Sequence, residues 1–314
     1  MTPKPLSSTL NLPPFLWRQA VQAALSEDLG TAGDLTSQAV VPAATQVTAS
    51  FVAREKGVVA GLPGARMTFE ALGDPTLGKV VFEARMQDGA TIKPGDVLAT
   101  VTGPAHVILA GERTALNILT HLSGIATRTA ELVAQVRNAG PGGKTPAICA
   151  TRKTLPGLKA LQKHAVRLGG GGSHRYRLDD AIMIKDNHLA LSGGVEKALA
   201  AARAHAGHLT KIELEVDTLE QLSQALDHAA RQQAEEQRPA GADVYLLDNM
   251  GPETLRKAVA MIHQKAPHAL AEASGGIKPG QVRAVAETGV DVISLGALTH
   301  SVTGLDIGLD IISA

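Results

Sequence analysis

A short apolar run that ends in polar side chains recurs along the chain from residue 147 to residue 297. Each run is followed by a longer stretch whose apolar residues recur every three or four positions, the pattern of an amphipathic helix. The runs are AICATRK (147–153), AIMIKDN (181–187), KIELEVD (211–217), DVYLLDN (243–249), LAEASGG (270–276) and DVISLGA (291–297). Strands that alternate with helices at this spacing predict right-handed parallel βα units.

The run at 211–217 separates two ways of arranging such units. Its three apolar residues alternate with Glu213, Glu215 and Asp217, so one face of the strand is apolar and the other is acidic. An open sheet covered by helices on both faces is usually apolar on both. A barrel with a charged mouth fits the alternation better. We therefore predict an α/β fold that is an incomplete TIM-like barrel.

The stretch LPGLKALQKHAVRLGG (155–170) predicts one of the barrel helices, with Pro156 in its first turn and Gly169 at its end. Three cations lie on this helix, and isolated helical cations are usually solvated. We expect a solvated face for Lys159, Lys163 and Arg167.

The first 110 residues follow a different pattern. Short β-rich runs are broken by DG, PGD and TGP turns, and FLWRQAVQAALSEDLG (15–30) predicts a flanking helix. A long helical stretch over 111–140, broken around Ser123-Gly124, links this module to the barrel. We place the domains at 1–112 and 113–314, and the last residues are candidates to pack back on the first domain.

Composition excludes several classes of protein. The 30 basic and 30 acidic side chains cancel, and only 2% of residues are aromatic, which disfavours a nucleic-acid partner. No apolar run approaches the ~18 residues of a membrane span, and no signal peptide is evident. The single cysteine, Cys149, precludes an internal disulfide, and no Cys/His cluster is spaced for zinc. We expect a cytoplasmic protein without a membrane partner.

Positive charge is nevertheless concentrated locally. Between Thr151 and His188 there are eight Lys or Arg residues against three Asp. In a neutral chain, such a cluster predicts a pocket for a small anion.

The chemically interesting residues follow the ends of the predicted strands, which meet at one mouth in a barrel. The cations there are Arg152, Lys153, His174, Arg175 and Lys185, and the carboxylates are Glu215 and Asp248. Glycine-containing turns at 274–276 and 294–297 expose backbone N–H groups suited to phosphate. Two carboxylates on neighbouring strand ends suit Mg²⁺, which takes few protein ligands and shares phosphate oxygens. The predicted ligand therefore carries phosphate and further anionic groups, together with magnesium.

Each of these features also has a structural interpretation. Glu213 and Asp217 could simply neutralise lysines in the barrel, and Asp248-Asn249 could cap a helix. Asp180 and Asp186 could be structural in the same way. A lone histidine such as His174 is more often structural than catalytic, and a buried cysteine is usually a small hydrophobe. The coincidence of the features at successive strand ends favours a functional site.

At these residues the sequence resembles the quinolinate phosphoribosyltransferase family. The resemblance covers nearly the whole chain. It is carried by EDLGTAGDLTS (27–37), GERTALNILTHLSGIAT (111–127), ATRKTLPGLK, HAVRLGGGGSHR, IMIKDNH, IELEVD, LLDNM, EASGGI and TGVDVISLGALTH (288–300).

The resemblance implies an N-terminal α/β sandwich, a C-terminal partial barrel and a homodimer, with further assembly left open. It implies that quinolinate and phosphoribosyl pyrophosphate give nicotinate mononucleotide, carbon dioxide and pyrophosphate with Mg²⁺. Residues matched to quinolinate are Arg152, His174, Arg175 and Lys185, with Arg113 entering from the partner subunit. Lys153, Glu215 and Asp248 would act catalytically on the phosphoribosyl pyrophosphate, the two acids as metal ligands. Substrate contacts would also come from Thr151, Ser274, Gly275, Gly276, Ser294, Leu295 and Gly296.

The sequence departs from the family pattern at Ser173, where asparagine is usual, and it leaves Arg177 without a role. The polar stretch 231–242 predicts an exposed insertion outside the site.

Three other functions stay open. A related transferase acting on nicotinate needs fewer cations than this site offers. A silent phosphate sensor does not need Glu215 and Asp248. A barrel lyase could form a Schiff base at Lys185, which borohydride trapping with substrate would expose.

Overall fold

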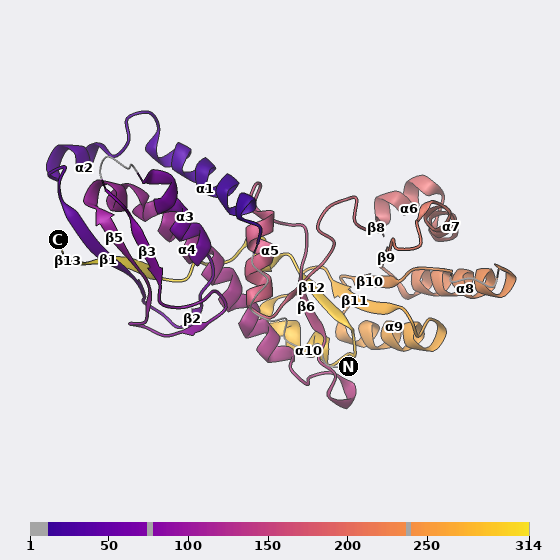
Figure 1. The fold of residues 1–314 in the computed structure, drawn as a ribbon. Coiled ribbons are helices and arrows are strands. Elements are labelled where there is room, and N and C mark those ends of the chain that lie inside the picture. The colour runs from indigo at the N-terminus through magenta and orange to yellow at the C-terminus, as the bar shows by residue number, and fades with distance from the viewer. Residues whose placement is uncertain (1–11, 74–77, 237–239, 314) are drawn as a thin grey trace.

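The computed structural model describes residues 12–73, 78–236 and 240–313. Figure 1 shows two lobes, with an antiparallel sheet in one and a parallel sheet in the other, connected by the long helix α4 (Ala105–Val136). The residues predicted for the site lie in the lobe with the parallel sheet, except Arg113, which lies on α4.

The N-terminal lobe pairs a sheet with helices. Among the described residues, four strands form an antiparallel sheet in the order β13-β1-β5-β3. The rings of Phe51, Phe69 and Phe82 meet in its core with centroids 6.1–6.2 Å apart. Its elements are α1 (Pro14–Leu29), α2 (Leu35–Val40), β1 (Gln46–Ala53), β2 (Gly57–Val58), α3 (Leu62–Leu72), β3 (Val81–Ala84), β4 (Thr91–Ile92) and β5 (Val97–Pro104).

The end of the chain returns to this lobe. Strand β13 (Ile307–Ser313) pairs antiparallel with β1, and Figure 1 shows it in yellow beside the indigo strand. The first and last strands of the described chain thus share one sheet.

Helix α4 is continuous, so the predicted break around Ser123-Gly124 is wrong. Gly124 lies inside this helix, and glycine is required there because the chain at Thr303–Leu305 passes directly over it and a side chain would overlap the Thr303 carbonyl. The Ser123 hydroxyl is buried and accepts a hydrogen bond from the Ala60 amide at 2.9 Å. Both small residues serve close packing. The domain boundary placed at 112/113 falls inside this helix.

The C-terminal lobe is an open barrel. In the described chain, seven parallel strands pair in the order β7-β6-β12-β11-β10-β9-β8. The last of them, β12, pairs with the first, β6, as closure of a barrel requires, but β7 and β8 are not paired. This confirms the incomplete barrel. The strands are β6 (Ala147–Ala150), β7 (Gly172–Ser173), β8 (Ile182–Ile184), β9 (Ile212–Val216), β10 (Val244–Asp248), β11 (Leu270–Ser274) and β12 (Val292–Leu295).

Helices cover the outside of the barrel. The described helices are α5 (Lys159–Leu168), α6 (Asp186–Ser192), α7 (Val195–His205), α8 (Leu219–Glu236), α9 (Pro252–Lys265), α10 (Val282–Ala286) and α11 (Ala297–His300), with short 3₁₀ turns at Pro141–Gly143 and Pro279–Gln281. No helix in the described ranges is both long and apolar enough to cross a membrane.

Two details of the prediction need correction. Helix α5 begins at Lys159, so Pro156 precedes it instead of lying in its first turn. Lys163 is buried, with 2% of its surface exposed, so it is not part of a solvated face. The stretch 231–242, predicted as an exposed insertion, begins inside α8, which continues to Glu236; residues 237–239 lie outside the described residues.

Candidate active site

The ends of β6, β8 and β10 place charged side chains close together. Burial raises the pKa of Asp248, at the end of β10, and the negative charge of Asp217 raises it further. The positive charges of Lys185 and Lys153 act on the same carboxyl and lower its pKa in part. Charges act this strongly only over short distances. The structure therefore brings these predicted residues to one mouth.

Lys185, directly after β8, and Glu215, on the neighbouring strand β9, form an ion pair. Lys185 Nζ donates to Glu215 Oε2 at 2.6 Å. The Lys185 backbone N–H donates to His188 Nδ1 at 2.9 Å, which fixes the start of α6. The glutamate is mostly buried, while the lysine is half exposed and can reach a ligand.

Asp248 rests against the turn that follows β11. A Cβ at Gly275, where φ is +84°, would lie 2.5 Å from Asn249 Oδ1 and 2.6 Å from Asp248 Oδ1. Only glycine fits a position that combines positive φ with this close approach. The 274–276 turn and the end of β10 therefore form one continuous surface.

Asn249 is a residue of this surface that sequence reasoning set aside as part of a helix cap. That interpretation is wrong, because α9 is preceded by Gly251. Asn249 has a positive φ of 54°, its backbone N–H donates to the Ser274 carbonyl at 3.1 Å, and its side-chain amide donates to Asp248. An asparagine directly after a carboxylate at a predicted strand end is the sequence signal that could have revealed it, because asparagine adopts positive φ more readily than most residues.

The second predicted phosphate turn packs against Lys153. A Cβ at Gly296 would lie 2.9 Å from Lys153 Cδ. Thr299 Oγ1 donates to the Lys153 carbonyl at 2.7 Å and holds this stretch against α11. Ser294 and Leu295 are buried in β12, so Gly296 is the member of the trio next to the cation.

Deeper in the barrel, His174 contacts two buried glutamates. Its Nε2 donates to Glu213 Oε2 at 2.6 Å, and Glu272 Oε1 lies 3.9 Å away. Glu213 therefore pairs with a histidine instead of neutralising a lysine. Burial raises the pKa of Glu272 to about 7, with Glu213 adding to the rise. Sequence reasoning missed Glu272, although it occupies an interior position two residues before Ser274.

Arg175 lies next to Arg152 at the rim. Arg175 Nη1 donates to the Ala181 carbonyl at 3.0 Å. Burial lowers the pKa of Arg175, and the charge of Arg152 lowers it further. Thr151 Oγ1 accepts from the Lys153 backbone N–H at 3.1 Å and shapes the turn that carries Arg152. Two neighbouring guanidinium groups favour a ligand with more than one carboxylate.

Exposed residues surround Arg152. It lines an open groove with Arg177 and Asp179, whose side chains are bonded at 3.1 Å between Nε and Oδ1. Arg177, unassigned from the sequence, is thus a residue of the rim. Ser173, the departure from the family pattern, is exposed at the end of β7 and pairs with Ala150.

Two structural interpretations are confirmed. Asp180 accepts from the backbone N–H groups of Tyr176 and Arg177 at 2.6 and 2.8 Å and so closes their loop. Cys149 is buried, and burial raises the pKa of its thiol to about 12, as expected of a small hydrophobe.

Arg113 belongs to the other lobe. It is exposed on α4, two residues after Gly111, which packs against Phe69 of the N-terminal core. A single chain therefore presents it on the N-terminal lobe, away from the barrel core.

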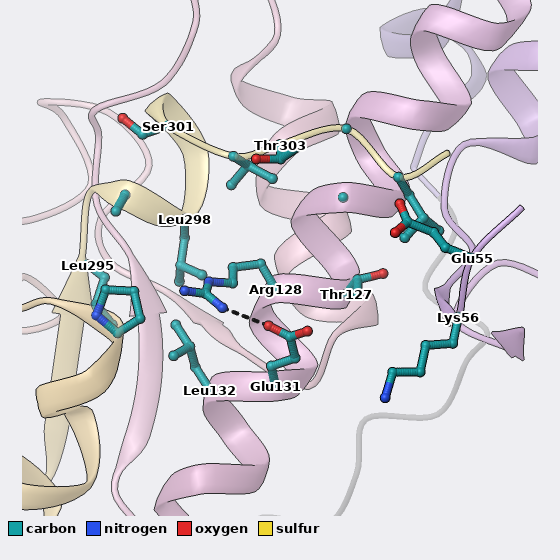
Figure 2. A pocket seen from close by; sticks show the side chains of 16 residues that line it. Glu55, Lys56, Thr127, Arg128, Glu131, Leu132, Leu295, Leu298, Ser301 and Thr303 are labelled. Carbon is teal, nitrogen blue, oxygen red and sulfur yellow. Dashed lines mark hydrogen bonds and ion pairs between the residues drawn. The ribbon is translucent and has the colours of Figure 1, made fainter. Parts of the chain in front are cut away.

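A separate cavity of about 480 Å³ lies between α4 and residues 295–305 (Figure 2). The ion pair of Arg128 and Glu131, 2.7 Å apart, lies in its wall. Leu295 is the residue it shares with the predicted set. The two cations that line it, Lys56 and Arg128, are accompanied by Glu55 and Glu131, so it lacks the excess of positive charge found at the barrel mouth, and we assign the site to the mouth.

The donors at the mouth suit magnesium. Asp248 and Glu215 offer oxygen ligands, and the raised pKa of Asp248 beside Asp217 marks a place where a cation would relieve repulsion. His174, Glu213 and Glu272 also offer ligand atoms within 4.8 Å of one another. That set includes an imidazole, which magnesium disfavours, and its histidine already donates to Glu213. Magnesium is better matched to Glu215 and Asp248.

An open α/β barrel whose mouth combines cations, two carboxylates and glycine turns defines an enzyme of phosphorylated, anionic substrates. Family models extend this to both lobes: quinolinate phosphoribosyl transferase, N-terminal domain, matches residues 34–123, and the C-terminal domain matches residues 125–310. The chain belongs to the quinolinate phosphoribosyltransferase family.

Individual relatives agree. A nicotinate-nucleotide pyrophosphorylase (carboxylating) from Mycobacterium leprae is 45% identical over 94% of this chain and 96% of its own length. The protein of the same name from Homo sapiens is 37% identical over 96% of this chain and 93% of its own length. The solved structure of the nicotinate-nucleotide pyrophosphorylase from Francisella tularensis has a TM-score of 0.82 at 31% identity, covering 96% of this chain and 98% of that one.

Proposed function

We propose that this chain transfers the phosphoribosyl group of phosphoribosyl pyrophosphate to quinolinate, releasing carbon dioxide and pyrophosphate and forming nicotinate mononucleotide for de novo NAD synthesis. The observation that supports this most is the grouping of Arg152, Arg175 and His174 at one end of the mouth. A dicarboxylate acid needs several cations, whereas a monocarboxylate needs fewer. The family membership and the names of the relatives agree with this choice.

The reaction needs little acid–base chemistry from the protein. The pyridine nitrogen attacks the ribose carbon as the bond from that carbon to pyrophosphate breaks. The ring nitrogen then carries positive charge and stabilises the electron pair left on the neighbouring ring carbon when its carboxylate leaves as carbon dioxide. That carbon then takes a proton from water, which gives nicotinate mononucleotide. The contribution of the chain is positioning and charge stabilisation.

The two ends of the mouth have separate tasks in this proposal. Arg152, His174 and Arg175 hold the acid, with Lys185 between them and Glu215. Lys153 stabilises the negative charge of the departing pyrophosphate, and the 274–276 and 294–296 turns hold the phosphate. Asp248 and Glu215 offset the positive charge that develops on the sugar.

Magnesium is part of the proposal. Glu215 and Asp248 would hold it, since both are hard oxygen donors beside the cationic mouth. When bound, the ion supplies neutralising charge for the pyrophosphate leaving group. Tight pairing of Glu215 with Lys185 makes Asp248 the stronger candidate for direct coordination.

A homodimer completes the proposed site. Arg113 is exposed on the N-terminal lobe, and an apolar groove of about 440 Å³ beside it is lined by Ala20, Ile118, Leu155 and Leu158 among others. We propose that a second copy covers this region and brings its Arg113 to the acid pocket. The one cysteine is buried and unpaired, which fits the reducing cytoplasm as the compartment.

A substrate-pair assay tests the proposed function. The protein is incubated with phosphoribosyl pyrophosphate, Mg²⁺ and either quinolinate or nicotinate, and the release of carbon dioxide and mononucleotide is measured. We expect stoichiometric carbon dioxide with quinolinate and no product with nicotinate. Turnover of nicotinate alone would overturn the assignment of the acid pocket, and no turnover of either acid would favour a binding protein.

A further inference from the structure

Lys163 is a buried cation on α5 that the proposed reaction does not use. Only 2% of its surface is exposed. Its Nζ donates to the Ala150 carbonyl at 3.1 Å and to the His174 carbonyl at 3.0 Å. It also lies over the Tyr176 ring, 5.9 Å from the centroid.

The two carbonyls mark the ends of neighbouring strands. Ala150 is the last residue of β6 and directly precedes Thr151 and Arg152, while His174 follows β7 and directly precedes Arg175. One ammonium group therefore connects the backbone points from which both predicted arginines of the acid pocket extend.

Strand β7 has little else to hold it. It is two residues long, forms an edge of the open sheet, and its register with β6 consists of Cys149 with Gly172 and Ala150 with Ser173. The His174 backbone N–H adds one further bond, at 3.1 Å to the Ala150 carbonyl. A short edge strand with so few bonds can shift. A side-chain donor that holds both ends restricts that shift.

The glycine run before β7 lets this arrangement form. A Cβ at Gly171 would lie 2.7 Å from Thr129 Cγ2 and 2.8 Å from Val166 Cγ1, and one at Gly172 would lie 2.8 Å from Cys149 Sγ. Glycines let the chain turn tightly from α5 into β7 and pass close to β6, so that β7 comes within reach of the Lys163 side chain. Gly171 and Gly172 thus serve packing below the site.

Burying the charged ammonium group of Lys163 costs desolvation free energy. Burial lowers the pKa of Lys163 to about 8, the charges of Lys159 and Arg152 also lower it, and Cys149 and Asp180 oppose them. An apolar side chain of similar length would fill the same volume without this penalty. What the ammonium group adds over such an apolar side chain is the pair of hydrogen bonds to the two carbonyls.

We propose that Lys163 is a positioning residue for the acid substrate: by bridging Ala150 and His174, it sets the spacing between Arg152 on one strand end and His174 with Arg175 on the other. This inference rests on the proposed function. The spacing matters because two carboxylates at fixed positions on a rigid ring must meet both strand ends at once. Of the groups proposed for phosphoribosyl pyrophosphate, Lys153 follows β6, but its carbonyl is held separately by Thr299. The turns at 274–276 and 294–296 follow other strands, β11 and β12, and do not depend on this bridge.

The test compares two affinities in the full-length protein. Lys163→Met keeps the length of the side chain and removes the donors, and Arg167→Met, on the same helix, is the control for loss of a cation. Dissociation constants are measured by calorimetry for quinolinate and for phosphoribosyl pyrophosphate, with melting temperature as a check of folding. We expect Lys163→Met to weaken quinolinate binding about tenfold or more and phosphoribosyl pyrophosphate binding less than about threefold. Arg167→Met should change neither, and Lys163→Arg should recover part of the quinolinate affinity.

Equal weakening of both ligands, or an unchanged affinity for quinolinate, would overturn the proposal. If Lys163→Met does not fold, Lys163→Gln takes its place and is judged by the same ratio of affinities. Failure of both to fold would also overturn it, because Lys163 would then be needed for the fold itself. Failure of the proposed function is distinguishable, since the unmodified protein would then not turn over quinolinate at all.

Discussion

His174 Nε2 donates to Glu213 Oε2 at 2.6 Å inside the barrel. The same nitrogen lies 3.9 Å from Glu272 Oε1, on β11, which β10 separates from the strand of Glu213. Burial by itself lowers the pKa of His174, but the hydrogen bond and charge of Glu213 and the charge of Glu272 outweigh it, and the net pKa is raised. The imidazole therefore stays protonated to higher pH than usual. A cationic His174 adds to the charge that the proposed acid substrate meets.

This cluster predicts how stability depends on pH. Raised pKa values mean that the native state keeps protons which the unfolded state loses, so the free energy of unfolding falls as pH rises. For Glu272 the fall runs from about 4.5 to about 7, and for His174 it begins near 6.5. Glu272→Gln lacks this titrating group. The free energy of unfolding of the wild type minus that of the variant should therefore decrease from pH 4.5 to 7. Denaturant unfolding at several pH values measures it, with exposed Glu253→Gln as control; parallel curves would contradict it.

Removing a cation of the acid pocket should abolish most catalysis without unfolding the protein. Arg175→Ala and Lys185→Ala each lose a charge-assisted contact worth roughly 1.5–3 kcal/mol, so quinolinate affinity should fall about tenfold or more. Steady-state kinetics and melting temperature measure this. Arg256→Ala and Lys257→Ala, exposed on α9, are matched controls. Near-wild-type kinetics for both pocket variants would show that the site lies elsewhere.

Gly275→Ala should damage the phosphate side of the mouth selectively. The new Cβ would meet Asn249 Oδ1 at 2.5 Å and Asp248 Oδ1 at 2.6 Å on a backbone with positive φ, so Asp248 must move. We expect kcat/KM for phosphoribosyl pyrophosphate to fall about 100-fold, as displacement of a catalytic group by ~1 Å can cause. Gly280→Ala, which has open space around its Cβ position, should behave like wild type. Similar losses in both variants would indicate a general loop effect.

Magnesium dependence should run through Asp248. Chelation is expected to stop turnover, and Asp248→Asn should raise the Mg²⁺ concentration for half-maximal rate about tenfold or more, because a charged oxygen ligand is lost. Titration of the rate with Mg²⁺ measures it. Asp227→Asn, a half-exposed residue of α8, is the control. An unchanged magnesium requirement in Asp248→Asn would exclude this carboxylate as a ligand.

Mixed subunits test the contribution of Arg113. Arg113→Ala and Arg175→Ala should each be inactive, yet a mixed dimer contains one site with neither change if Arg113 acts across the interface. We expect up to about a quarter of wild-type activity after subunit exchange at equal amounts, since half of the dimers are mixed and each has one intact site. Subunit exchange is followed separately with differently tagged chains. Full exchange without recovered activity would place Arg113 in its own subunit's site.

Several features of the fold could be predicted from the sequence. The recurring apolar runs indicated the strands of the barrel, except the two-residue β7, which is too short to leave a periodic pattern. The alternation in KIELEVD correctly placed Glu213 and Glu215 inside the barrel. The break assigned at Ser123-Gly124 was wrong, since a glycine in a helix can mark close packing as well as a helix end.

For the site, the sequence by itself determined which kinds of side chain stand at the strand ends, because that position depends only on local order within each βα unit. The tertiary structure decided which of them meet. Glu213 contacts His174 and Glu215 contacts Lys185, although 30 or more positions of the chain separate the partners in each pair. Burial, too, was settled only by packing: Lys163 resembles Lys159 and Arg167 in sequence, but the glycine turn brings two carbonyls to its ammonium group. Partners and desolvation depend on contacts between segments far apart in the chain, and no local pattern encodes them.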